Sequence, residues 1–319
     1  MILVTSANGF VGTALCHHLV TSGVGVRGTM RRLERFCGQI DSMEYTQIGE
    51  IGPASDWSKV LKGVGVVVHL AARVHVMGDK TADQLAAFRT VNAEGTLSFA
   101  RQAAEAGVRR FIYLSSVKVN GEQTLPNQLF TERDTPAPRN PYSVSKYEAE
   151  EGLCTLAQQT NMEVVIIRSP LVYGPGVRAN FHALLRAVAR GVPLPFGAIH
   201  NRRSLVALGN LVDLIITCRD HPAAANQIFL VSDGESLSTP ELIRRMARAL
   251  GGPARLIPVP PAVLMTGATL LGKREVAARL CGSLEVDITK SQKMLGWTPP
   301  VSVDEGLLRT AEHYLLSQR

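Results

Sequence analysis

The first half of the chain alternates short apolar runs with longer amphipathic stretches, and this alternation limits the possible folds more than any other feature. The apolar runs are mostly β-branched and lie at 2–5, 24–30, 43–48, 64–70, 110–115 and 164–168. Stretches with helical spacing lie between them at 10–22, 83–106 and 142–159. Runs without a polar face suit strands that helices cover on both sides. We therefore predict an α/β fold built on a doubly wound parallel sheet.

The second half has a weaker alternation and more Pro and Gly. It predicts one further strand at 227–232 and helices at 239–250, 261–271 and 303–316. We assign a dinucleotide-binding Rossmann domain to residues 1–169, rejoined by about 204–235. The rest, 170–203 and 236–319, is predicted to form a smaller mixed α/β substrate-binding region.

The charge and the cysteines exclude several classes of protein. The 34 Lys and Arg give a net charge of +7, but they are spread along the chain, so we expect no nucleic-acid partner. The cysteines have no CxxC spacing and no histidine cluster beside them, so we expect reduced thiols and no metal site. No apolar run approaches the roughly 20 residues that span a bilayer. We expect a cytoplasmic protein without membrane insertion.

A glycine-containing turn, SANGFVG, follows the first predicted strand directly and opens the first predicted helix. Backbone N–H groups at such a helix start can bind a pyrophosphate, although a helix-capping turn without a ligand has the same pattern. The predicted cofactor-binding residues here are Ser6, Asn8, Gly9, Phe10, Val11 and Gly12.

The end of the second predicted strand indicates which dinucleotide is bound. Enzymes that select NAD usually place an acidic residue there for the ribose 2′-hydroxyl. This chain has Arg31 and Arg32 instead, and an arginine can pair with a 2′-phosphate. We predict NADP(H) as the preferred cofactor, with NAD(H) also possible. The side chains of adjacent residues point in different directions and cannot both face the same site. The alternative is therefore that these arginines are only exposed surface residues.

A tyrosine and a lysine four residues apart on a predicted helix suggest acid–base chemistry. Tyr142 and Lys146 share a helix face, and an ammonium near a phenol favours its ionised form. Ser116, at the end of the strand before this helix, can hydrogen-bond the same substrate oxygen. An exposed helix pair and a turn-capping serine are the alternatives. We predict these three residues to be catalytic.

Together these motifs resemble the extended short-chain dehydrogenase/reductase family of the NAD-dependent epimerase/dehydratase type. Ser6 stands where the family's GxxGxxG pattern has its first glycine, and a β-carbon there strains the turn if φ is positive. The resemblance gives Lys146 a second role at the nicotinamide ribose. It adds four further cofactor-site residues, namely Leu70, Ala71, Ala72 and Asn92.

The same resemblance extends to the substrate side. VYGPG at 172–176 is similar to the family's turn beside a nucleotide-linked sugar, and LGWTP at 295–299 to its C-terminal packing segment. An arginine fork suits a diphosphate because its donors match two oxygens. The predicted substrate-binding residues are Lys118, Asn180, Arg203 and Arg279.

The resemblance implies an enzyme that acts on a UDP-sugar as a homodimer. Family dehydratases carry an Asp-Glu pair after the catalytic serine, whereas this chain has Val117 and Lys118, so we do not expect a dehydratase. The leading hypothesis is reduction of the C4 ketone of a UDP-linked 4-keto-6-deoxy sugar for surface polysaccharide. The alternative is an NAD-dependent UDP-sugar 4-epimerase. A second alternative is a non-catalytic dinucleotide sensor.

Overall fold

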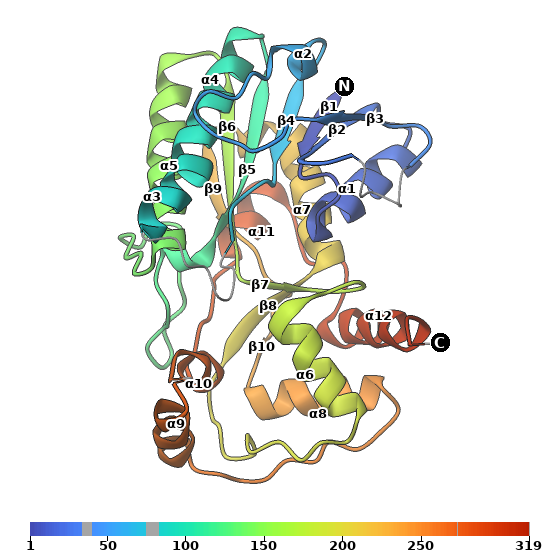
Figure 1. Cartoon of the computed structure of the whole chain (residues 1–319), viewed down its shortest axis with the longest axis vertical. Coiled ribbons are helices and arrows are strands. Elements are labelled where there is room, and N and C mark those ends of the chain that lie inside the picture. The colour runs from blue at the N-terminus through green and yellow to red at the C-terminus, as the bar shows by residue number, and fades with distance from the viewer. Residues whose placement is uncertain (34–39, 75–82, 273, 319) are drawn as a thin grey trace.

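The computed structural model describes residues 1–33, 40–74, 83–272 and 274–318. Its main feature is a seven-stranded parallel sheet in the order β3-β2-β1-β4-β5-β6-β9 (Figure 1). This confirms the predicted α/β fold. The strands, in chain order, are β1 (Ile2–Thr5), β2 (Val26–Met30), β3 (Glu44–Gln47), β4 (Val66–His69), β5 (Arg110–Ser116), β6 (Glu163–Ser169) and β9 (Gln227–Leu230).

Helices cover both faces of this sheet, which explains why its strands are apolar on both sides. On one face lie α1 (Phe10–Thr21) and α7 (Leu208–Asp220), whose apolar side chains pack with those of β1, β4 and β9. On the other lie α2 (Ser58–Leu61), α4 (Thr96–Glu105) and α5 (Pro141–Gln159). Because the sheet is parallel, all its strands end on the same side, and the segments that follow these ends are neighbours there.

The single helix predicted at 83–106 is interrupted in the structure. It consists of α3 (Gln84–Arg89), a π-helical segment (Thr90–Gly95) and α4. Gly95 lies so close to Ile51 that an added β-carbon would be 2.8 Å from its Cγ2 atom. Asn92 is buried in this segment, and π-helical insertions of this kind are frequent at functional sites.

A second, smaller sheet lies beyond the ends of the large one (Figure 1). Its order is β10-β8-β7, formed by β7 (Leu171–Tyr173), β8 (Arg203–Ala207) and β10 (Ser236–Leu237). The helices of this part are α6 (Ala179–Ala189), α8 (Thr239–Ala249), α9 (Pro261–Leu270), α10 (Arg274–Cys281), α11 (Thr289–Leu295) and α12 (Val303–Leu316). Of these, α6, α8 and α12 pack with the small sheet around one core, while α11 contacts β9.

Asp233 joins the two sheets. Its buried carboxylate accepts hydrogen bonds from the Tyr173 hydroxyl at 2.8 Å, the Ala207 N–H at 2.7 Å and the Asn210 side-chain amide at 2.7 Å. Burial raises the pKa of this carboxyl, and the three donors act in the opposite direction. Residues from β7, β8 and the start of α7 are thereby held at one point.

Within the described ranges, no helix combines the length and the apolar character that crossing a bilayer requires. Cys16, Cys154, Cys218 and Cys281 are free thiols, and Cys37 lies outside the described residues.

Candidate functional site

The turn between β1 and α1 is tight and leaves the start of α1 uncapped by any side chain. Gly9 is the N-cap, and its N–H donates to the Ser6 carbonyl at 2.8 Å. A β-carbon on Gly12 would lie 2.1 Å from that carbonyl oxygen, so only glycine fits there. The first N–H groups of a helix have no partner within it, and here no acidic side chain occupies the first turn. The turn therefore fits the pyrophosphate of a dinucleotide.

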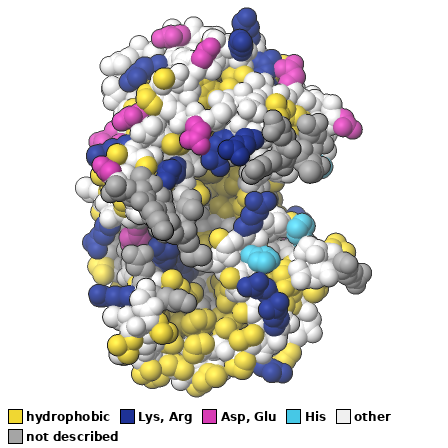
Figure 2. Space-filling view, in the orientation of Figure 1, with side chains coloured by type: hydrophobic (Ala, Val, Ile, Leu, Met, Phe, Trp, Pro, Cys, Tyr) yellow, Lys and Arg dark blue, Asp and Glu magenta, His cyan; other side chains and the backbone are white. Residues whose placement is uncertain are grey.

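Ser6 adopts a positive φ of 53°. The position thus requires the left-handed conformation that favours glycine, as the sequence comparison with GxxGxxG anticipated. Phe10 is half-buried and packs against the cores of both parts of the molecule. Asn8, Gly9 and Phe10 border a cleft of about 740 Å³ that continues to α12. Figure 2 shows the molecule hollowed between its two parts, with basic side chains along the hollow.

Arg31 and Arg32 directly follow β2 and are both exposed. They lie at the end of the strand next to β1, where the sequence predicted a contact with the adenosine ribose. Gly28 lies in the same strand, where a β-carbon would come within 2.7 Å of Ala7. The strand is therefore packed closely against the turn.

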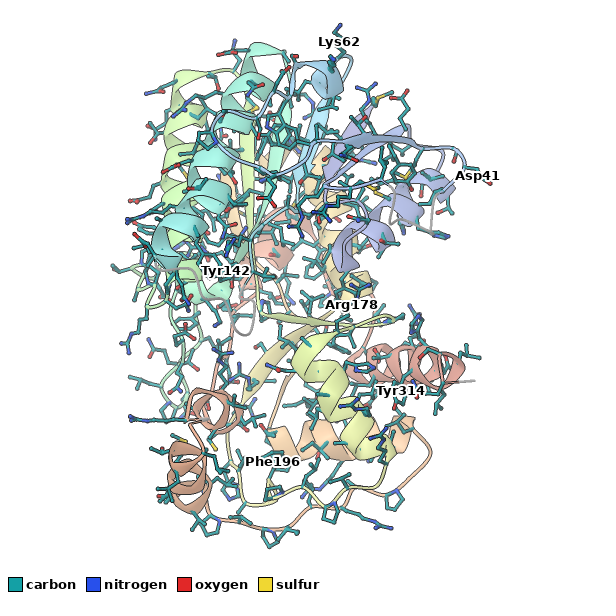
Figure 3. The ribbon with its side chains drawn as sticks, in the orientation of Figure 1. Asp41, Lys62, Tyr142, Arg178, Phe196 and Tyr314 are labelled. Atoms are coloured by element: carbon teal, nitrogen blue, oxygen red, sulfur yellow. The ribbon has the colours of Figure 1, made fainter. Side chains whose placement is uncertain are left out.

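The structure brings the three predicted catalytic residues together at the ends of β5 and α5. Ser116 ends β5 and lies near Tyr142, in the first turn of α5, close enough for its hydroxyl to act on the pKa of the phenol. Lys146 lies one turn further on, and its Nζ atom donates to the Leu114 carbonyl at 2.7 Å. Asn140 caps α5 through reciprocal hydrogen bonds with Ser143. This capping fixes the start of the helix and thereby the position of Tyr142. Figure 3 shows Tyr142 at the level where the two parts of the molecule meet.

The electrostatics of this group differ from the prediction. Burial raises the pKa of Tyr142 to about 12, and the hydrogen bond with Ser116 acts in the opposite direction. Burial lowers the pKa of Lys146 to about 7, against the effect of Glu150. The predicted lowering of the phenol pKa is therefore wrong for this structure, because burial outweighs the opposing effect of Ser116.

Asn92 connects three elements of the site. Its side chain accepts from the Arg73 N–H at 2.7 Å and donates to the Arg73 carbonyl and to Ser145 Oγ, both at 3.0 Å. Ser145 precedes Lys146, so Asn92 holds the segment after β4 against α5. The predicted residues Leu70, Ala71 and Ala72 form that segment. Asn92 thus orders the site.

A buried histidine that the sequence analysis assigned no role lies beneath this segment. Thr5 Oγ1 accepts from the N–H groups of Leu70 and Ala71, both at 3.0 Å, so its own proton goes to His69 Nδ1 at 2.9 Å. His69 Nε2 then donates to Thr96 Oγ1 at 3.1 Å. Burial lowers the pKa of His69 to about 3, and the charge of Lys146 acts in the same direction. The ring is therefore neutral.

A buried ion pair, also missed from the sequence, supports the catalytic helix. Glu150 lies one turn after Lys146 and pairs with Arg168 of β6 at 2.6 Å, with both side chains buried. Glu150 also accepts from Ser115, and Arg168 donates to Asn120 at 3.1 Å. Glu150 follows Lys146 at the same four-residue spacing that separates Lys146 from Tyr142, and this spacing could have identified it in the sequence. Breaking such a pair typically costs about 3–5 kcal/mol.

Three of the four predicted substrate residues lie in one basic neighbourhood. Lys118 pairs with Glu122 at 3.4 Å, and Glu122 also accepts from Asn140, the cap of the catalytic helix. Arg203 donates to the Arg279 carbonyl at 2.7 Å, and its pKa is lowered by burial and then by the charge of Arg279. Glu122 acts on Arg203 in the opposite direction. No sequence motif indicates Glu122.

Asn180 is not part of this neighbourhood. It is exposed in the first turn of α6 and, among the described residues, makes none of the bonds that hold the group together. Ala179 before it has a positive φ of 53°, which strains the start of the helix.

Comparisons with known proteins agree with this geometry. Residues 2–232 match the model of the NAD dependent epimerase/dehydratase family. The chain is 48% identical over 316 residues to a UDP-glucose 4-epimerase of Vibrio cholerae, covering 98% of this chain and 95% of that protein. It is also similar in fold to two solved structures that share 22% and 20% of its sequence. One is a UDP-glucose 4-epimerase from Thermotoga maritima with UDP-glucose (TM-score 0.78, covering 100% and 99% of the two chains). The other is a UDP-glucuronic acid 4-epimerase from Bacillus cereus with NAD (TM-score 0.77, covering 100% and 99%).

Proposed function

This chain belongs to the NAD dependent epimerase/dehydratase family, and on that premise we propose that it is a UDP-sugar 4-epimerase. The observation that carries the proposal is the contact between Ser116 and Tyr142, with Lys146 one turn away on the same helix. This group lies at the sheet edge that also carries the turn before α1. The similarity to the Vibrio cholerae protein favours epimerisation over the 4-ketoreductase that the sequence alone put first.

Each catalytic side chain has a distinct task in this proposal. A dinucleotide held by the turn at residues 6–12 and the segment at 70–72 would supply reversible hydride chemistry at C4 of the sugar. Tyr142 removes the proton of the 4-hydroxyl and later gives it back. Ser116 donates a hydrogen bond to the same sugar oxygen and holds it in the orientation that proton transfer requires. Lys146, whose pKa burial lowers to about 7, favours the phenolate when it is protonated, while the Glu150–Arg168 pair fixes the helix that carries both residues.

The residues after Ser116 oppose a dehydratase. Val117 is buried, and Lys118 is paired with Glu122, so neither supplies the acid and base needed to remove water. In our proposal Lys118, Arg203 and Arg279 instead hold the diphosphate of the UDP-sugar, with Asn180 contributing from α6. Arg203 begins β8, and its guanidinium is held beside Arg279 through the Arg279 carbonyl.

The cofactor, the domain division and the assembly are further parts of the proposal. The turn at residues 6–12 and the segment at 70–72 hold the dinucleotide. Arg31 and Arg32 donate hydrogen bonds to a 2′-phosphate, so that NADP(H) is preferred and NAD(H) is also bound. Residues 1–169, rejoined by about 204–235, form the dinucleotide-binding domain. Two copies of the chain form a homodimer.

The test is direct conversion of UDP-glucose or UDP-N-acetylglucosamine to the 4-epimer, followed by chromatography. The purified enzyme is expected to convert either sugar without net consumption of nicotinamide. Replacing Tyr142 with Phe should lower kcat by about 100-fold or more, because the acid–base group is lost. Ser116→Ala should lower kcat with a smaller effect on KM.

One competing outcome has its own readout. Stoichiometric oxidation of NADPH by a UDP-linked 4-keto-6-deoxy sugar, without epimerisation of any UDP-hexose, would assign the chain to the reductases. If Tyr142→Phe epimerises as fast as the wild type, the proposed chemistry is wrong.

A further inference from the structure

The segment 256–272 contains no charged residue, yet it lies on the surface. Its helix α9 is apolar except for two threonines, and none of its ten residues, all of which the structure describes, is buried. Val263 is 59% exposed and Leu270 84%. Surface helices normally bury their apolar face against the protein. This helix exposes apolar side chains that its own fold does not cover.

The neighbouring helix covers only part of this surface. α9 packs against α10, where Ala277 is buried but Val276 remains exposed. We call the exposed side chains of Ile257, Val263, Leu270, Leu271 and Val276 the α9 patch. Figure 2 shows apolar side chains gathered at the end of the molecule where Figure 1 places α8, α9 and α10. A gathered apolar surface of this kind marks a binding face, whereas single exposed apolar residues do not.

The charged residues that flank the uncharged segment 256–272 most closely are basic on both sides. Between Glu241 and Glu275 the sequence has no acidic residue, whereas its basic residues there are Arg244, Arg245, Arg248, Arg255, Lys273 and Arg274. Arg244 and Arg245 pair with Glu241, but Arg255 and Arg274 are exposed at either side of the uncharged segment. An apolar surface with exposed cations on both sides is complementary to an anionic bilayer, which offers apolar acyl chains next to negative headgroups.

We propose that the α9 patch and its flanking arginines dock the protein peripherally on an anionic lipid bilayer. The apolar side chains enter the boundary between headgroups and acyl chains, while the arginines contact anionic headgroups. The segment does not span the bilayer, because it is shorter than a spanning helix and contains Pro258, Pro260 and Pro261. Helix α10, which packs against α9, contains Arg279, whose carbonyl accepts a hydrogen bond from Arg203. Docking therefore places the sugar-binding side near the membrane surface.

A second copy of the chain is a poorer partner for the same patch. In a two-fold symmetric contact each surface meets itself, so the exposed arginines of one copy would face those of the other. Like charges so placed oppose association, whereas anionic lipids neutralise them.

The test is co-sedimentation of the full-length protein with vesicles. Vesicles of phosphatidylcholine alone are compared with vesicles that contain about 30% phosphatidylglycerol, a fraction chosen to give a clearly negative surface. The wild type should sediment with the anionic vesicles and much less with the neutral ones. The double variant Val263→Glu/Leu270→Glu should reduce the bound fraction by about tenfold or more, because two carboxylates enter the interface.

A matched control carries the same change of charge elsewhere. Leu308→Glu/Leu316→Glu replaces two exposed leucines of α12 and should bind vesicles like the wild type. Thermal unfolding checks that both variants fold, and turnover of a soluble UDP-sugar should be the same in all three proteins. That readout separates failure of docking from failure of the proposed epimerase activity. Equal sedimentation of the wild type and the α9 variant, or a dimer in sedimentation velocity that the α9 variant alone abolishes, would overturn the proposal.

Discussion

The carbonyl oxygen of Ser6 lies 2.1 Å from the place that a β-carbon on Gly12 would take. The two ends of the dinucleotide turn are therefore in direct contact, and the path of the backbone between them leaves no space for a side chain. Gly12, the third residue of α1, and Ser6, the first residue after β1, thus depend on each other.

Gly12→Ala should damage the turn and with it the cofactor site. The added methyl group must displace either the Ser6 carbonyl or the start of α1, so we expect dinucleotide affinity to fall by at least about tenfold. Fluorescence titration with NAD(H) and NADP(H) measures this change. Gly25→Ala is the control, because no atom lies within 4 Å of its added β-carbon. Unchanged affinity in Gly12→Ala would mean that the dinucleotide binds elsewhere.

Ser6→Gly should have the opposite effect. Relief of the left-handed conformation at Ser6 should stabilise the fold by about 1 kcal/mol and tighten dinucleotide binding. Ser6→Ala keeps the β-carbon and so should show neither gain. Denaturant unfolding and cofactor titration of both variants provide the comparison, and equal behaviour of Gly and Ala at this position would contradict the strain argument.

The arginines after β2 should govern the choice between the two dinucleotides. In the double variant Arg31→Ala/Arg32→Ala, we expect NADP(H) affinity to fall by about tenfold relative to NAD(H), because a charged hydrogen bond to the 2′-phosphate is lost. The ratio of the two dissociation constants is the readout. Arg101→Ala removes an exposed arginine of α4 and should leave the ratio unchanged. A ratio that does not move in the double variant assigns these arginines to the surface.

His69 should make the fold sensitive to mild acid. Its pKa is about 3 in the folded chain, against an ordinary value of 6.5, so the unfolded chain binds the extra proton in between. Stability from this group is complete above pH 6.5 and is lost as the pH falls toward 3. Between pH 6.5 and pH 5 the loss is about 2 kcal/mol.

Urea unfolding at several pH values tests this prediction. His69→Gln should be less stable than the wild type at pH 7.5, since Thr5 and Thr96 lose partners, but its stability should fall less steeply toward pH 5. Parallel pH profiles of the two proteins would rule out His69 as the source.

The sequence predicted the inner strands of the large sheet well because they are buried on both faces and are therefore plainly apolar. The smaller mixed region was also predicted, but its individual strands and α7 were not, and α7 shows the physical reason. Asn210 and Asp213 break the apolar pattern of α7, yet Asn210 is buried, where it bonds Asp233 and the backbone of Val301. Buried polar residues of this kind are paired by contacts distant in the sequence, which a periodic pattern does not reveal.

The candidate site divides in the same way. Ser116 and Tyr142 lie close together because one ends a strand and the other lies in the first turn of a helix. Both positions can be predicted from the sequence. The raised pKa of Tyr142 depends on how much protein surrounds the phenol, which only packing determines. Glu122 escaped notice because its link between Lys118 and the Asn140 cap depends on the path of a loop.

The three hydrogen bonds of Asp233 have a consequence for turnover. They tie β7, β8 and α7 to the segment after β9, so the small sheet is fixed against the large one when the chain folds. Moving one sheet against the other would break the contacts of a buried carboxylate. In the epimerase proposed above, sugar and dinucleotide would therefore meet between parts that are already aligned, and little entropy would be lost to aligning those parts in each cycle.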